Sequence, residues 1–119
     1  MCIENPVPMK ARWTVAYKVV DVVDGVYRSE FTNTRVKDGK PGPPVQSPFR
    51  KDPNLVGKWS AFRKLKDARW WTSLAAGQVI LKVALKGDLI KGDLMNEMMA
   101  PVGIVHVAGE SIKILGEVI

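Results

Sequence analysis

The sequence is poor in the residues that build covalent and metal cross-links. Cys2 is the only cysteine and His106 the only histidine among 119 residues. A single cysteine cannot form an intrachain disulfide, and these two residues cannot supply the four ligands of a usual structural zinc site. A structural metal of that kind is therefore excluded, and we expect no cofactor.

Long apolar runs are missing as well. The chain has no stretch of about 18 apolar residues that would cross a bilayer, so we expect no membrane partner. Its first residues, MCIENPVPMK, contain an acidic residue and two prolines, where a secretory signal needs a basic start and an unbroken apolar stretch. We therefore expect a cytoplasmic protein.

Catalytic signatures are equally scarce. A histidine-dependent nucleophile must use His106, but a lone histidine in an apolar strand such as GIVHVAG is typical of a hydrogen-bonded core residue. Cys2, beside the terminus, is a poor partner for it. No GxxxxGK(S/T) motif is present, so no phosphate-cradling loop is expected. The sequence thus predicts no catalytic residues and no enzyme activity.

The composition is that of one basic globular domain, which we place at residues 1–119. The chain is 46% hydrophobic and 25% charged, close to the globular averages. Its net charge is +6. This charge favours polyanions or acidic protein surfaces as partners, through an attraction that weakens with salt.

The first half of the chain predicts an N-terminal arm over 1–12, a β-hairpin and a long loop. Trp13–Val23 alternates in the manner of a strand, with one face formed by Trp13, Val15, Tyr17 and Val19. Asp24-Gly25 predicts a type I′ turn, which needs positive φ at both residues, and VYRSEF returns as a second strand. Residues 35–57 hold five prolines and three glycines, a density that predicts the loop.

The second half predicts a short strand at WSAF, a helix over 65–76 ended by Gly77, and three further strands. QVILKVAL is expected to be a central strand that is buried on both faces. LIKGDLMNEMMAP predicts a turn of helix before Pro101, and VGIVHV and SIKILGEVI predict two closing strands joined at 108–110. The sum is an α+β fold with one main helix on a mostly antiparallel sheet.

One segment, GKWSAFRKLKDARWW, interleaves five cationic residues with four aromatic ones. On a helical wheel Trp71 shares a core stripe with Leu65 and Ala68, whereas Trp70 falls on the opposite side with Lys66. The candidate partner-binding residues are therefore Lys58, Arg63, Lys66, Arg69, Trp70 and Leu74. The alternative is a solvated helix face whose tryptophan is covered by the loop. No sequence-reading motif accompanies the segment, so any nucleic-acid contact is expected to be to the backbone.

The stretches MCIENPVP, YKVVDVVDGVYRSEFTN, GKWSAFRKLKDARWW and SIKILGEVI together resemble small uncharacterised proteins of phages and prophages. Those proteins begin Met-Cys, continue with a YKV-type strand and carry a GFHSFKTLEDA-like strand-to-helix segment. The histidine of that segment is missing here, where KWSAF stands instead. The resemblance implies the cytoplasm of a bacterial host and a protein that acts by binding.

Three functions fit these observations. The first is a non-catalytic inhibitor of a host macromolecule, such as an antiviral defence complex, in the manner of an anti-CRISPR protein; its partner would be a host protein or nucleoprotein complex. The second is a non-specific nucleic-acid-binding accessory protein, which would show a steep salt dependence. The third is a sponge for a nucleotide-like ligand, with aromatic rings for stacking and Lys/Arg for phosphate.

Overall fold

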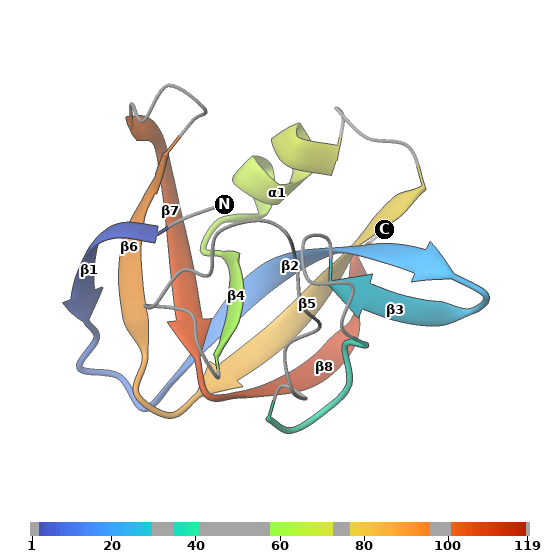
Figure 1. Ribbon diagram of the computed structural model, residues 1–119, viewed down its shortest axis with the longest axis horizontal. Coiled ribbons are helices and arrows are strands. Elements are labelled where there is room, and N and C mark those ends of the chain that lie inside the picture. The colour runs from blue at the N-terminus through green and yellow to red at the C-terminus, as the bar shows by residue number, and fades with distance from the viewer. Residues whose placement is uncertain (1–2, 30–34, 41–57, 73–76, 96–100, 119) are drawn as a thin grey trace, which may run out of the picture.

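The computed structural model describes residues 3–29, 35–40, 58–72, 77–95 and 101–118. These residues form eight strands and one helix: β1 (Ile3–Pro8), β2 (Trp13–Val23), β3 (Val26–Ser29), β4 (Trp59–Phe62), α1 (Leu65–Thr72), β5 (Gln78–Lys86), β6 (Ile90–Met95), β7 (Pro101–Gly109) and β8 (Ser111–Val118). The strands make one sheet in the order β1-β6-β7-β4-β2-β5-β8, with β3 beside β2 (Figure 1). This confirms the α+β prediction, although the content is mostly β.

The N-terminal hairpin has the predicted form. β2 spans Trp13–Val23, and β3 pairs antiparallel with its second half. Asp24 and Gly25 have φ of 52° and 74°, the left-handed values that a type I′ turn requires. Asp tolerates this region better than most residues because its short side chain bonds locally. The local sequence alone therefore sets the geometry of the hairpin.

The two faces of the sheet carry separate hydrophobic clusters. The larger cluster lies on what we call the inner face, and its β2 and β5 members are Ala16, Val20, Leu81, Val83 and Leu85. The smaller cluster lies on the outer face, where α1 covers the sheet; its members are Val19, Phe62, Ala68, Ile80 and Ile104. The QVILKVAL strand is thus buried along its inner face, as predicted, but on its outer face only Ile80 and Ala84 are buried and Lys82 is exposed.

Residues 35–40 form a strap across the inner face. Isolated bridges join Arg35 to β3 and Gly39 to β8. The side chain of Val36 is buried in the larger cluster, and Nε1 of Trp59 donates a hydrogen bond to the carbonyl of Gly39 at 2.9 Å. The strap is the first part of the predicted long loop over 35–57, whose remaining residues lie outside the described part of the chain.

The chain turns a corner between β7 and β8 at Glu110, which confirms the predicted junction (Figure 1). β7 pairs with β4 and β6, whereas β8 pairs with β5. A Cβ on Gly109 would lie 2.7 Å from Cδ2 of Leu89 and 3.1 Å from the carbonyl oxygen of Lys86. A side chain at Gly109 therefore requires the Leu89 side chain to move and presses on the backbone of Lys86.

Three segments differ from the sequence-based expectation or extend beyond it. Residues 90–95 form strand β6, which the sequence did not predict, because β1 and β7 both supply hydrogen-bonding partners for their backbone. Residues 96–100, directly before Pro101, lie outside the described part, so the predicted turn of helix stays a prediction there. Strand β1 lies within the predicted arm over 1–12. Helix α1 is described to Thr72, and Gly77 beyond it has the expected positive φ, 80°. No helix in the described part of the chain is long and apolar enough to span a membrane.

Candidate functional site

Helix α1 is held on the outer face by its apolar stripe. Ala68 is fully buried, and Leu65 and Trp71 pack half-buried against the smaller cluster. The ring of Trp71 lies 6.1 Å from the ring of Phe62 at an interplanar angle of 43°, a tilted contact of the favourable kind. The structure therefore gives Trp71 the anchoring role that the helical wheel predicts.

The opposite side of α1 presents an exposed tryptophan, and three exposed cations lie near it in the sequence. Trp70 is 51% exposed, and its ring centroid lies 6.3 Å from that of Trp71. Arg63, Lys66 and Arg69 are exposed beside it in the sequence. We call Arg63, Lys66, Arg69 and Trp70 the α1 surface.

Of the two other sequence-derived candidates, Lys58 does not join this surface and Leu74 cannot be placed. Lys58 precedes β4, and its ammonium donates a hydrogen bond to the carbonyl of Asp88 at 2.8 Å. Because β4 is extended, the five residues from Lys58 to Arg63 separate them by about 16 Å. Leu74 lies outside the described residues.

His106 is a core residue. It is 4% exposed, and its ring meets the ring of Phe62 edge-on at a centroid distance of 4.4 Å. Burial, with a further contribution from the charge of Lys18, lowers the pKa of His106 to about 3. The imidazole is therefore neutral at pH 7, and its Nε2 atom accepts no hydrogen bond from any described residue.

A second basic and aromatic surface, which sequence reasoning missed, lies on the outer face beyond α1. Trp13 pairs with Lys86, Val15 with Ala84, and Tyr17 with Lys82 across β2 and β5. On the other side of β5, Lys86 pairs with Ser111, Ala84 with Lys113, and Lys82 with Gly116. Residues that pair directly point to the same face. We call Trp13, Tyr17, Lys82, Lys86 and Lys113 the sheet strip; Tyr17 is its half-buried member, because it also packs against the smaller cluster that α1 covers.

The sequence contains only part of the pattern that would predict the sheet strip. The alternation of β2 places Trp13 and Tyr17 on one face, and Lys82 and Lys86 are likewise four residues apart. The sequence does not reveal which face of β5 meets which face of β2, because that depends on the register of two strands more than 50 residues apart. The strip therefore emerges only from the pairing.

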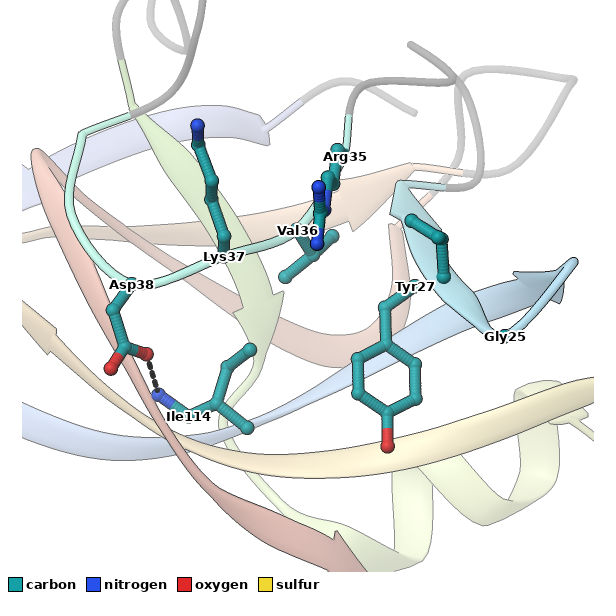
Figure 2. Close-up of a pocket in the computed structure, with 8 residues that line it drawn as sticks. Gly25, Tyr27, Arg35, Val36, Lys37, Asp38 and Ile114 are labelled. Carbon is teal, nitrogen blue, oxygen red and sulfur yellow. Dashed lines mark hydrogen bonds between the residues drawn. The ribbon is translucent and has the colours of Figure 1, made fainter.

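A shallow pocket of about 580 Å³ lies between the strap, the hairpin and β8. Figure 2 shows the ring of Tyr27 and the side chain of Ile114 on one side, with Arg35 and Lys37 carried by the strap above them. The Asp38 carboxylate accepts a hydrogen bond from the backbone N–H of Ile114 at 2.7 Å. A hydrogen bond to Glu117 raises the pKa of Tyr27. The pocket is open to solvent, and Asp38 already uses one oxygen within the protein.

No group of three His, Cys, Asp or Glu side chains that would hold a metal occurs among the described residues. Comparison with family models, curated proteins and solved structures finds no match to this chain.

Proposed function

We propose that this protein is a non-catalytic inhibitor that binds a host macromolecule, such as an antiviral defence complex, in the cytoplasm of a bacterial cell. It binds through the α1 surface. The observation that carries the proposal is the difference between two adjacent tryptophans: Trp71 packs on Phe62, whereas Trp70 is half exposed on the side of α1 that carries Lys66, with Arg63 and Arg69 exposed nearby in the sequence.

The energetics of interfaces support this assignment. Tryptophan and arginine are enriched among the few residues that carry most of the binding energy of an interface. Exposed cations around such an anchor steer an acidic partner and raise the association rate. Trp70, Lys66 and Arg69 on α1, with Arg63 just before the helix, combine these two features.

The burial of His106 favours a binding function over a catalytic one. His106, the residue best suited to act as a base at neutral pH, is buried among apolar side chains with its pKa lowered to about 3. An imidazole in that environment meets no substrate and exchanges no proton near pH 7. The resemblance to small phage proteins supports an inhibitor that works by covering a surface.

The test is capture of partners from host bacterial lysate on the immobilised protein, with and without nuclease. Trp70→Ala should leave the melting temperature within about 2 °C and reduce capture of the partner at least about tenfold. Trp13→Ala removes an equally exposed ring elsewhere and is the matched control; it should capture normally after nuclease treatment.

Charge provides a second readout of the same surface. Lys66→Glu should weaken capture more at low salt than at high salt, because its contribution is largely screened attraction. Full capture by Trp70→Ala, or an unfolded Trp70→Ala protein, would defeat the proposal. Capture that disappears with nuclease for every variant would favour the nucleic-acid-binding alternative instead.

A further inference from the structure

The sheet strip has the pattern of charge and exposure expected of a surface that receives an anion. Trp13 is 58% exposed, and Lys82, Lys86 and Lys113 are all exposed. None of the nine paired positions of the strip on β2, β5 and β8 holds an acidic residue. Glu110 adjoins it only at one end, beside Gly87. The exposed Arg12 precedes Trp13 and adds a further cation at that end.

The spacing of the strip also matters. Directly paired residues on neighbouring strands lie about 5 Å apart, and successive same-face residues of one strand lie about 7 Å apart. Lys86 therefore lies beside Trp13, and Lys82 lies beside Tyr17, about 13 Å further along. The exposed ring of Trp13 thus has the ammonium group of Lys86 within reach of the same nucleotide, and Lys82 lies further along the strip, where a neighbouring phosphate would pass.

We infer that the sheet strip binds single-stranded nucleic acid without sequence preference, with the exposed ring of Trp13 stacking on a base and Lys82, Lys86 and Lys113 contacting phosphates. Flat aromatic rings on a sheet stack on unpaired bases, and lysines beside them follow the backbone. In a duplex the faces of the bases are stacked on one another, so a duplex would contact the lysines but would not stack on Trp13.

The strip is separate from the α1 surface, and this inference does not depend on the proposed function. α1 packs on a cluster that includes Val19 and Ile80 and that Tyr17 also contacts. Trp13, by contrast, is six positions before Val19 in extended β2 and therefore lies about 20 Å from it. Variants of the strip can therefore be tested on purified protein without a host partner.

The experiment is titration of a fluorescein-labelled 20-nucleotide oligo(dT) into the full-length protein, followed by anisotropy. The native protein should bind, and its affinity should fall steeply as salt rises from 50 to 200 mM. Trp13→Ala should weaken binding about fivefold or more, whereas Trp13→Phe, which keeps a ring, should restore most of the affinity. Thermal melts of both variants check that the fold is intact.

Controls separate stacking and local charge from a general effect of net charge. Lys113→Glu should reduce affinity strongly, whereas Lys37→Glu, the same change at an exposed residue of the strap, should have a much smaller effect. A 20-base-pair duplex should bind with no dependence on Trp13. The inference is overturned by absence of binding at 50 mM salt, by equal affinity of native protein and Trp13→Ala, or by equal losses in the two lysine variants. Trp70→Ala should bind oligo(dT) as the native protein does, so that a failure of the sheet strip can be told apart from a failure of the α1 surface.

Discussion

The buried histidine makes the stability of this protein depend on acid in a defined way. In an unfolded chain His106 takes up a proton near pH 6.5, whereas in the folded protein burial keeps it neutral down to about pH 3. Protonation therefore favours the unfolded state. The contribution of His106 to the free energy of unfolding is therefore fully present above pH 6.5 and is lost as the pH falls from 6.5 toward 3.

The size of the effect follows from this window. Each pH unit below 6.5 lowers the free energy of unfolding by about 1.4 kcal/mol from this group alone. At pH 4.5 the loss is about 2.7 kcal/mol, a large part of the stability of a small domain. Carboxylates also titrate at that pH, so the contribution of His106 must be isolated with a variant.

His106→Leu is that variant, because leucine keeps an apolar contact with Phe62 and removes the titrating group. Urea denaturation followed by tryptophan fluorescence at pH 7.5 and pH 4.5 gives the free energy of unfolding of both proteins. The stability lost by the native protein between these pH values should exceed that lost by the variant by about 2.7 kcal/mol. Equal losses in the two proteins would show that His106 is not buried in a neutral state.

Three other predictions concern the fold. Trp71→Ala should destabilise the protein by about 3 kcal/mol, at the low end for a large aromatic residue because Trp71 is half-buried; a melting temperature equal to that of Trp70→Ala would contradict this. Gly25→Val should lower the free energy of unfolding by about 1–2 kcal/mol because of the positive φ alone, and Gly25→Asn should lower it less; denaturant midpoints will show whether these two variants differ. Gly109→Ala should lower it by about 1–3 kcal/mol because the added methyl group meets Leu89. A chelator should leave the melting temperature unchanged, and a stoichiometric metal in the purified protein would refute this.

The features predicted correctly from the sequence are those that neighbouring residues determine. Asp24-Gly25 specifies its turn because few residues other than Asn, Asp and Gly accept positive φ. The exposure of Trp70 and the packing of Trp71 follow from a 100° step on a helix, which holds wherever the helix packs. Neither inference required knowledge of a distant partner.

The features that were missed depend on distant pairing. Residues 90–95 contain Gly92 and Asp93, which have weak strand propensity, yet they form β6 because β1 and β7 lie on either side. Lys58 lies close to Arg63 in sequence but at the far end of an extended strand. The sheet strip combines residues of β2, β5 and β8. The pairing of β5 with β8 includes a bulge near Gly116, which no local sequence pattern predicts.

The α1 surface and the sheet strip, taken together, favour one kind of partner over the others. Both lie on the outer face of the same sheet, since α1 packs on Val19 and the strip continues along β2 toward Trp13. An acidic protein would satisfy the α1 surface, and a single strand would satisfy the sheet strip. A nucleoprotein complex offers both at once, and contacts at two sites joined by a rigid fold reinforce each other because the second forms at high effective concentration. Of the proposed partners, a nucleoprotein therefore accounts for both exposed tryptophans, whereas a free protein leaves Trp13 without a role and free nucleic acid leaves Trp70 without one.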